Sequence, residues 1–346
     1  MSISVQSLVQ AMESIAPVSL AESWDNVGLL LGAPSDPLSG PVLLTIDLTE
    51  PVLDEARSMK AGAIVAYHPP IFDPIRRLTG EQWRGRVLLG AARAGMAVYC
   101  PHTALDNAPG ALGDWLADAV LEPGKPRGAD RRALRPAGLQ RPTEELKIVT
   151  FAPPEKADTL RKALASAGAG IIGRYEVCSF AAPGTGTFLG QSGARPAVGQ
   201  AGRLESAHEV RLEMVCSRAA LSLALATLRQ FHPYEEPAID VYELLPRPER
   251  STGAGRRLVL DHPVPIAALV ARLKAALGVP YVQVAAAGRE AVSCIGVCPG
   301  SGGGLWVDAQ RDGCELFVTG EMKHHDVLAA AGAGLSIICA GHTATE

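Results

Sequence analysis

The order of short apolar runs and amphipathic segments constrains this chain more than any other feature. Near the N-terminus, three short apolar runs alternate with two helical patterns, and the same order returns near the C-terminus. The six runs cover residues 41–47, 63–67, 96–100, 291–299, 314–320 and 335–340. Continuously apolar strands separated by helices are typical of parallel βαβ units buried on both faces. We therefore predict an α/β core with mostly parallel sheets, built by duplication of one unit.

A different pattern lies between the two copies. Residues 144–246 show the order strand–helix–strand–strand–helix–strand, which is the order of a ferredoxin-like fold. Segments rich in Pro, Gly and Arg flank this region at 123–143 and 247–254, and we interpret both as linkers. The expected organisation is one discontinuous α/β core, 1–122 with 255–346, interrupted by an inserted ferredoxin-like α+β domain.

Composition limits the classes of function. The 346 residues carry a net charge of −4, which argues against a nucleic-acid partner. A basic run at 125–141 lies among Pro and Gly, and it fits a solvated linker better than a phosphate-binding patch. No apolar stretch is long enough for a membrane span, and the N-terminus lacks the pattern of a signal peptide. The seven cysteines are scattered without a CxxC motif, which indicates reduced thiols and a cytoplasmic protein.

Two similar pentapeptides follow the third strand of each copy. "HTALD" covers 102–106 and "HTATE" covers 342–346. Ligands of open α/β sheets bind outside the carboxyl ends of the strands, so His102 and His342 are expected at corresponding ligand-binding corners. His68 ends the second strand of the first copy, directly before two prolines that fix the backbone.

These corners predict a metal site. The set His68, Asp106, His342 and Glu346, with His102 beside it, combines imidazoles and carboxylates, which suit Zn²⁺, Mn²⁺ or Fe²⁺. Buried acids without a cation would be costly unless they were protonated. Two alternatives stay open for single residues: Asp106 could cap the following helix, and His68 could cap a turn.

Two further motifs have alternative interpretations. The turn "GSGGGLW" (300–306) is a weak candidate for a phosphate site, because it matches no nucleotide fingerprint. The pair His324-His325 opens a helix, where it could approach the metal site or lie on the helix surface.

Several sequence blocks together resemble the Nif-three-like family, whose members are named as homologues of a type 2 GTP cyclohydrolase I. The blocks are "LAESWDNVGLLLG", "IDLTEPVLDEA", "YHPPIF", "PHTALDNAPGALGDWLA", "VTGEMKHHDVLAA" and "AGHTATE". "HPYEEPAIDVYEL" is similar to a motif of the PII-like domain that is inserted in the family's longer members. The resemblance covers nearly the whole chain.

The resemblance implies two divalent metal ions per subunit inside a toroidal homohexamer. His68 and Asp106 would bind one ion, His342 the other, and Glu346 would bridge them. His102 would lie close by, as a ligand, a support for a ligand, or an acid/base. Many members carry His where this chain has Tyr67. The resemblance therefore leaves open whether the second metal position is fully occupied in this chain. Family chains also continue past the glutamate, so we expect Glu346 to be weakly anchored.

Three classes of function remain. The first is a metal-dependent hydrolase acting on a small-molecule substrate, a nucleotide or phosphoester, with His102 moving a proton. The second is a protein that binds or delivers metal, or a ring-shaped interaction and regulatory protein, with little catalysis. The third, a DNA-associated regulator, is disfavoured by the acidic balance.

Overall fold

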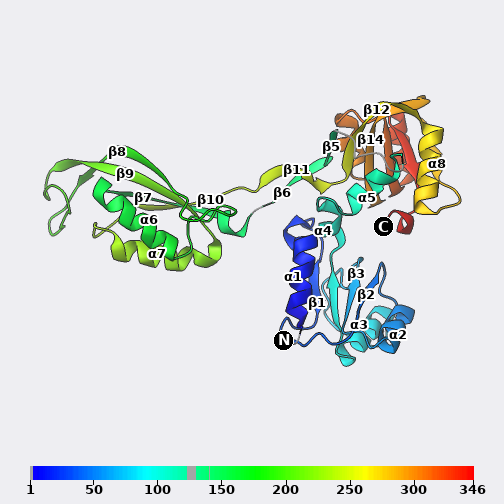
Figure 1. Ribbon diagram of the computed structural model, residues 1–346, viewed down its shortest axis with the longest axis horizontal. Helices are drawn as coiled ribbons and strands as arrows, with labels where there is room; N and C mark the ends of the chain where they lie inside the picture. The colour runs from blue at the N-terminus through cyan, green and yellow to red at the C-terminus, as the bar shows by residue number, and fades with distance from the viewer. Residues whose placement is uncertain (1–2, 123–129, 140) are drawn as a thin grey trace. The chain divides into compact units, whose positions relative to one another are not determined.

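The chain forms two compact units. The computed structural model describes residues 3–122, 130–139 and 141–346. Unit 1 comprises Met1–Leu139 and Pro248–Glu346, and unit 2 comprises Gln140–Arg247. The described residues form a mixed α/β protein with several sheets, two of them in the core of unit 1 and one in unit 2 (Figure 1).

The first sheet of unit 1 has the strand order β1-β4-β3-β2. Its strands are β1 (Gly28–Leu31), β2 (Val42–Thr45), β3 (Ala63–Ala66) and β4 (Ala97–Cys100). The last three are parallel to one another, and β1 pairs antiparallel with β4. The apolar side chains of α2 (Glu50–Ser58) and α3 (Trp83–Arg93) share a core with β3 and β4. Helix α1 (Val5–Ile15) precedes β1 in the chain.

The second sheet of unit 1 has the order β13-β16-β15-β14-β12-β5. Its strands are β5 (Asp130–Arg132), β12 (Arg256–Pro265), β13 (Gln283–Ala285), β14 (Ala291–Ser301), β15 (Leu316–Glu321) and β16 (Ser336–Cys339). Helices cover both faces, which explains why the strands are continuously apolar. One core packs the sheet against α5 (Leu112–Ala119) and α8 (Ile266–Leu277), and the other packs it against α9 (Trp306–Arg311) and α10 (His324–Gly332).

The two sheets repeat one arrangement. β13-β16-β15-β14 has the same order as β1-β4-β3-β2, with an antiparallel strand at one edge followed by three parallel strands. The expectation of mostly parallel sheets is wrong for the second sheet, because β13, β12 and β5 all pair antiparallel. Only the strands of the βαβ runs were predicted from the sequence; the edge strand β1 and the strand β12, which lies between β14 and β5, were missed.

The segments interpreted as linkers contain strands. β5 pairs with β12, and β6 (Arg135–Leu139) pairs with β11 (Arg247–Ala254). Residues 123–129 and 140 lie outside the described residues. The basic run is also not simply solvated where it is described, because Arg131 has an 8% exposed side chain and pairs with Asp114.

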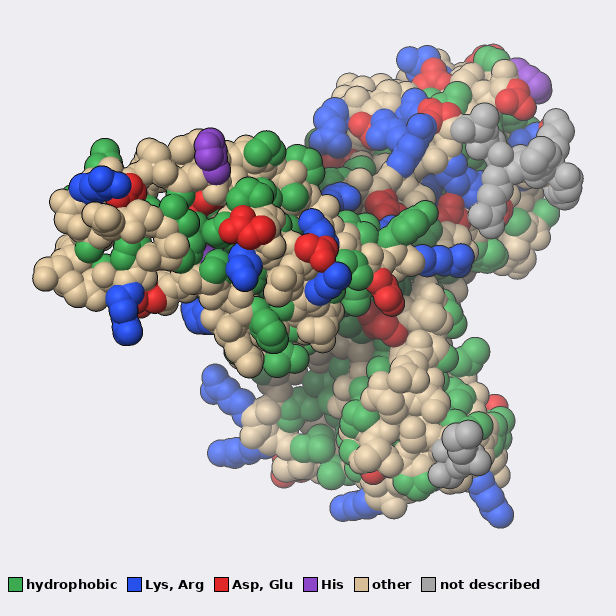
Figure 2. Space-filling view, turned by 60° about the vertical axis from the view of Figure 1, so that its left-hand side comes forward, with side chains coloured by type: hydrophobic (Ala, Val, Ile, Leu, Met, Phe, Trp, Pro, Cys, Tyr) green, Lys and Arg blue, Asp and Glu red, His purple; other side chains and the backbone are tan. Residues whose placement is uncertain are grey.

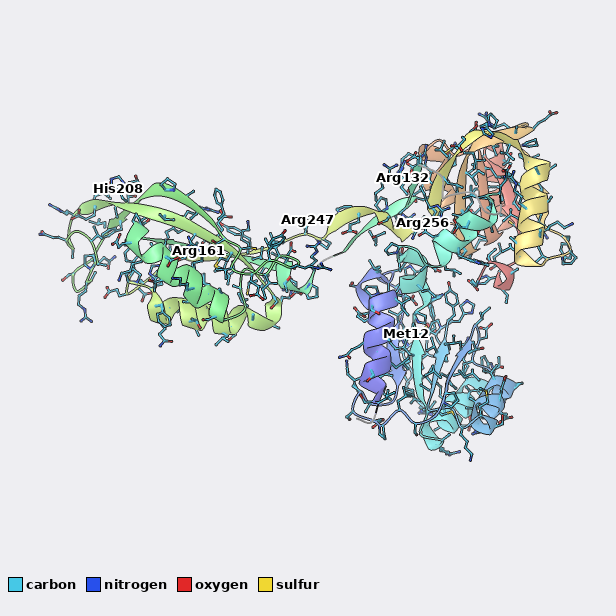
Figure 3. The ribbon with its side chains drawn as sticks, in the orientation of Figure 1. Met12, Arg132, Arg161, His208, Arg247 and Arg256 are labelled. Atoms are coloured by element: carbon cyan, nitrogen blue, oxygen red, sulfur yellow. The ribbon has the colours of Figure 1, made fainter. Side chains whose placement is uncertain are left out.

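Arg256 connects the start of β12 to helix α5. Its side chain is buried at the start of β12, where its guanidinium donates to Asp114 of α5 and to three backbone carbonyls (Figure 3). A buried arginine is tolerated only when its donors find partners of this kind. Burial opposes ionisation of Asp114, but its contacts with Arg256 and Gly110 outweigh this and lower its pKa.

Unit 2 has the element order β7-α6-β8-β9-α7-β10, as predicted for 144–246. Its strands are β7 (Leu146–Ala152), β8 (Phe180–Leu189), β9 (Leu204–Cys216) and β10 (Ile239–Glu243), in an antiparallel sheet of order β10-β7-β9-β8. α6 (Ala157–Ser166) and α7 (Arg218–Phe231) pack on one face of this sheet. On the face of unit 2 that Figure 2 shows, basic side chains lie beside acidic ones. Lys147 and Glu213 form one of the ion pairs of this unit.

Among the described residues, no helix combines the length and apolar character that a membrane crossing requires.

Candidate metal centre

Three potential metal ligands from the two copies come together in unit 1. His68 follows β3, while His342 and Glu346 flank the short helical turn Thr343–Thr345 after β16. Their ligand atoms all lie within 4.8 Å of one another. His68 Nε2 is 3.3 Å from Glu346 Oε2, and His342 Nε2 is 3.1 Å from Glu346 Oε1. Each oxygen of one carboxylate therefore faces a different imidazole.

An outer carboxylate holds each imidazole in place. His68 Nδ1 lies 2.9 Å from Asp47 Oδ1, and His342 Nδ1 lies 3.1 Å from Glu321 Oε1. Asp47 follows β2 and Glu321 ends β15, so each acid comes from the parallel strand beside the one that carries the histidine. An acceptor at Nδ1 fixes the ring orientation and leaves Nε2 as the ligand nitrogen, as in many metal sites.

Glu346 is firmly held. Its side chain is 4% exposed, and among the described residues Oε2 has no hydrogen-bond partner beyond the 3.3 Å approach of His68 Nε2. The neighbouring Thr345 is buried, accepts from the backbone N–H of Gly300, and donates to the carbonyl of His342. The expectation that Glu346 is weakly anchored is therefore wrong, because the preceding turn is tied to β14.

Gly300 is required beside this carboxylate. Its φ is +57°, and a Cβ at this position would lie 2.2 Å from Glu346 Oε1. The glycine run proposed as a weak phosphate site thus makes room for Glu346. Further along the run, the N–H of Gly302 donates to Thr319 at 2.9 Å.

Electrostatics at the centre favour a cation. The hydrogen bond to Glu346 raises the pKa of His68, burial opposes this, and the contact with Asp47 adds to it, which brings the pKa to about 9. Metal-free, the centre therefore holds a proton between His68 and its acids. Two imidazoles around a buried carboxylate form a donor set that fits a divalent cation, which would replace that proton.

Asp106 lies beside the group but is not one of the three converging ligands. Its Oδ1 accepts a 2.6 Å hydrogen bond from the phenol of Tyr67. Burial raises the pKa of Asp106 to about 6, although the bond from Tyr67 and the charge of His102 oppose this shift. Asp106 lies within α4 (His102–Asn107), so the helix-capping alternative does not describe its contact.

His102 is also adjacent and separately held. Its Nδ1 lies 2.8 Å from Asp25 Oδ1, and its ring centroid is 5.5 Å from that of His68. Burial opposes ionisation of Asp25, but hydrogen bonds from His102 and Thr103 outweigh it and lower the pKa of Asp25. The φ of His102 is +27°, an unusual value for a residue other than glycine, and such strain often occurs at functional sites.

The sequence analysis missed the supporting acids Asp25, Asp47 and Glu321. Two of them had a usable signal, because Asp47 ends one predicted strand and Glu321 directly follows another. The pair His324-His325 is exposed at the start of α10 and is not part of the converging group. All seven cysteines are described and unpaired.

Comparison with known proteins places the chain among relatives. Residues 3–346 match the family described as Duf34/NIF3 (NGG1p interacting factor 3). A Halalkalibacterium halodurans protein called "GTP cyclohydrolase 1 type 2 homolog" is 34% identical over 339 residues, covering 97% of this chain and 88% of that protein. A Rattus norvegicus protein called "NIF3-like protein 1" is 33% identical, covering 99% of this chain and 84% of that protein.

A solved structure agrees with these matches. The crystal structure of a Bacillus cereus protein related to NIF3 superposes with a TM-score of 0.71 at 32% identity, covering 100% of this chain and 90% of that one.

Proposed function

The chain belongs to the Duf34/NIF3 family, and from this premise we propose that it is a metal-dependent hydrolase acting on a nucleotide or phosphoester. One observation carries the proposal. Two imidazoles and one buried carboxylate converge within 4.8 Å, and an outer acid orients each imidazole. Two histidines and a glutamate form a ligand set that leaves a coordination position open for a substrate.

We propose two ion positions of unequal strength. His68, His342 and Glu346 form the stronger one, since they already converge. A second ion would use Asp106 together with Glu346, whose two oxygens contact different imidazoles. This position is weaker because the Tyr67 phenol competes for the Asp106 carboxylate. Zn²⁺, Mn²⁺ and Fe²⁺ all suit these ligands.

The chain's own groups supply the remaining chemistry. Divalent ions at such a centre supply Lewis acidity to a phosphoryl or ring-carbon centre. His102 is the proposed acid/base group: Asp25 holds its Nδ1 side, and its ring lies next to that of His68. Asp47 and Glu321 keep the ligand imidazoles oriented, and Tyr67 positions Asp106.

The wider assignments rest on the family resemblance. We propose a cytoplasmic homohexamer in which unit 2 is a PII-like domain inserted into a duplicated α/β core of 1–122 and 255–346. The antiparallel four-stranded sheet of unit 2, with two helices on one face, supports a ferredoxin-like or PII-like assignment. Size-exclusion chromatography with light scattering tests the hexamer.

A turnover assay tests the hydrolase. The purified full chain, loaded separately with Mn²⁺, Zn²⁺ or Fe²⁺, is offered a panel of nucleotides and phosphoesters, and products are separated by chromatography. Turnover should disappear after chelation, return with the metal, and be lost in His342→Ala. Activity that survives both chelation and His342→Ala would contradict the proposal.

The alternative is a metal-binding or metal-delivery protein without turnover. The Tyr67–Asp106 hydrogen bond favours it, because this bond leaves only one group of ligands ready for an ion. One tightly bound ion per chain with no turnover on the whole panel would support this alternative over the hydrolase.

A further inference from the structure

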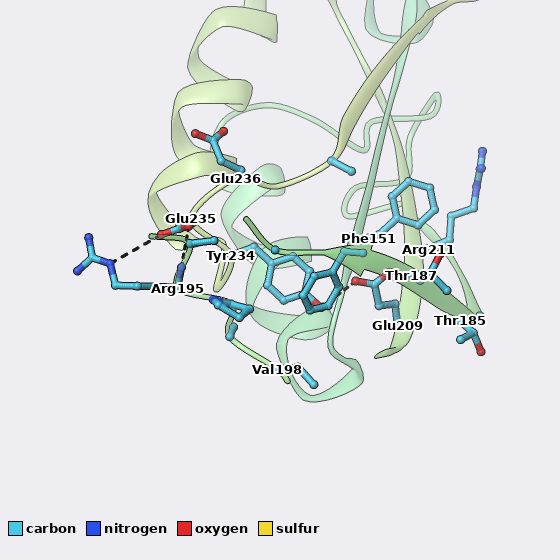
Figure 4. Close-up of a pocket in the computed structure, with 18 of the residues that line it drawn as sticks. Phe151, Thr185, Thr187, Arg195, Val198, Glu209, Arg211, Tyr234, Glu235 and Glu236 are labelled. Atoms are coloured by element: carbon cyan, nitrogen blue, oxygen red, sulfur yellow. Dashed lines mark hydrogen bonds and ion pairs between the residues drawn. The ribbon is translucent and has the colours of Figure 1, made fainter. Parts of the chain in front are cut away.

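Unit 2 contains a cavity that belongs to none of the groups described above. It has a volume of about 610 Å³, within the usual range for small-molecule sites. It lies between the β8–β9 hairpin, the loop residues 194–198 and the segment 234–238 after α7 (Figure 4). All its lining residues come from unit 2.

Aromatic side chains form much of the wall. Phe151, Phe188 and Tyr234 line the cavity, and each is only partly buried in unit 2 itself. Phe151 and Glu209 project from the sheet face opposite the residues that pack on α6 and α7, because successive strand residues alternate between faces. Partly exposed aromatic faces in a concave site are suited to stacking against a planar ring.

Two glycines make the β8 wall flat. Glycine is disfavoured inside strands, where it often marks close approach of a ligand or another group. A Cβ at Gly186 would lie 2.1 Å from Glu209 Oε2, so Gly186 makes room for this carboxylate. A Cβ at Gly184 would meet nothing within 4 Å. No neighbouring atom requires glycine at Gly184, and the open space above it belongs to the cavity.

A positioned carboxylate supplies the polar contact. Tyr234 Oη donates to Glu209 Oε1 at 2.8 Å, and Figure 4 shows the two side chains pointing toward one another. Burial, together with this bond, raises the pKa of Tyr234 well above its usual range, so the phenol remains a donor. Oε2 lies over Gly186 in the cavity wall, where it can accept from a ligand N–H.

The charges argue against a phosphorylated ligand. Glu209, Glu235 and Glu236 line the cavity together with only two arginines, Arg195 and Arg211. The two arginines already have acidic neighbours: Arg211 Nε donates to Glu213 at 2.7 Å, and Arg195 Nε lies 3.9 Å from Glu235. Three acids outnumber the two arginines, and each arginine already has an acidic neighbour, so an uncharged ligand fits better than a phosphate.

We propose that this cavity binds a neutral, planar heteroaromatic molecule with N–H donors on one edge, stacked on the aromatic wall and hydrogen-bonded to Glu209. The site is independent of the metal centre and does not rest on the proposed hydrolase activity. Guanosine is a suitable probe, because its base presents a ring N–H and an amino group side by side. Adenosine is the comparison, since its ring nitrogen beside the amino group is an acceptor that would oppose a carboxylate.

Calorimetric titration of the full chain tests the proposal. Guanosine should bind saturably and more tightly than adenosine or guanosine 5′-monophosphate. Glu209→Gln should weaken guanosine binding by about tenfold or more, the effect of losing a charged acceptor. Gly184→Val should abolish binding, because valine suits a strand and its side chain enters the open space.

Two controls separate the site from the fold and from the metal centre. Ala181→Val places the same side chain on an exposed β8 position outside the cavity, and it should leave binding unchanged. His342→Ala should likewise retain guanosine binding. The proposal is overturned if guanosine shows no saturable binding up to about 1 mM, if the monophosphate binds more tightly, or if Gly184→Val binds normally while folding as well as Ala181→Val.

Discussion

The two corners that carry "HTALD" and "HTATE" occupy corresponding places but make different contacts. Each follows the second strand from the antiparallel edge of its sheet, β4 in one case and β16 in the other. Glu346 faces two imidazoles, one at each of its carboxylate oxygens. Asp106 accepts from the Tyr67 phenol instead. Duplication thus supplies matching positions, while the neighbouring side chains decide which acid is ready for a cation.

The largest expected difference between the corners is in how much each histidine contributes to the affinity for the first ion. His342→Ala should weaken binding of the first ion by more than about 100-fold, because it removes a direct ligand. His102→Ala should change that affinity by only a few-fold, since His102 is held by Asp25 outside the converging group. Competition with a metal-sensitive dye measures both affinities. Equal losses in the two variants would show that the corners are equivalent.

Substitution of the outer acids Asp47 and Glu321 is a second test of this comparison. Asp47→Asn and Glu321→Gln should each weaken the first ion by about 10- to 100-fold, because each removes the carboxylate that orients a ligand imidazole. Asp54→Asn is the matched control, since Asp54 is exposed on α2, pairs with Arg57, and is not one of the converging ligands. If Asp47→Asn and Glu321→Gln bind the first ion as tightly as this control, the outer acids do not contribute to metal binding.

The glycine run of the second copy provides a smaller effect. Gly300→Ala should weaken the first ion by about tenfold, because its Cβ displaces Glu346. Gly304→Ala is the control in the same run, where a Cβ would meet nothing within 4 Å. Circular dichroism checks that both variants fold. Normal binding in a folded Gly300→Ala variant would show that Glu346 can move without cost.

The smallest expected effect sharpens the role of Tyr67. Tyr67→Phe removes the donor that competes for Asp106, so the second ion should bind up to about tenfold tighter, while the first is unchanged. Calorimetry with Mn²⁺ separates the two steps. Weaker binding of the second ion in Tyr67→Phe would mean that the phenol itself supports that ion.

Much of the core could be predicted from the sequence, because buried parallel strands leave a clear apolar pattern. The runs 63–67 and 96–100 became β3 and β4 almost to the residue. The strands β1 and β12 were missed, since both pair antiparallel with segments distant in the sequence and lie outside the βαβ pattern. The charge of the basic run suggested solvent, but the Arg131 side chain is only 8% exposed because it pairs with Asp114.

The residues of the candidate site likewise fall into a group that the sequence predicted and a group that it did not. His68, His342 and Glu346 were found because strand ends and repeated motifs mark them. Asp47 and Glu321 were missed because no local pattern pairs an acid with a histidine on the neighbouring strand. The competition of Tyr67 for Asp106 depends on side-chain geometry across 39 positions of sequence, which spacing alone does not reveal.

Metal stoichiometry in two single variants tests the central claim most directly. After dialysis against limiting Zn²⁺ or Mn²⁺, elemental analysis of the full chain counts the tightly bound ions in Glu346→Gln and Asp106→Asn. We expect Asp106→Asn to keep the tight ion of the unmodified chain and Glu346→Gln to lose it. Loss of that ion in Asp106→Asn, with retention in Glu346→Gln, would contradict the assignment of the cation-ready corner to the second copy.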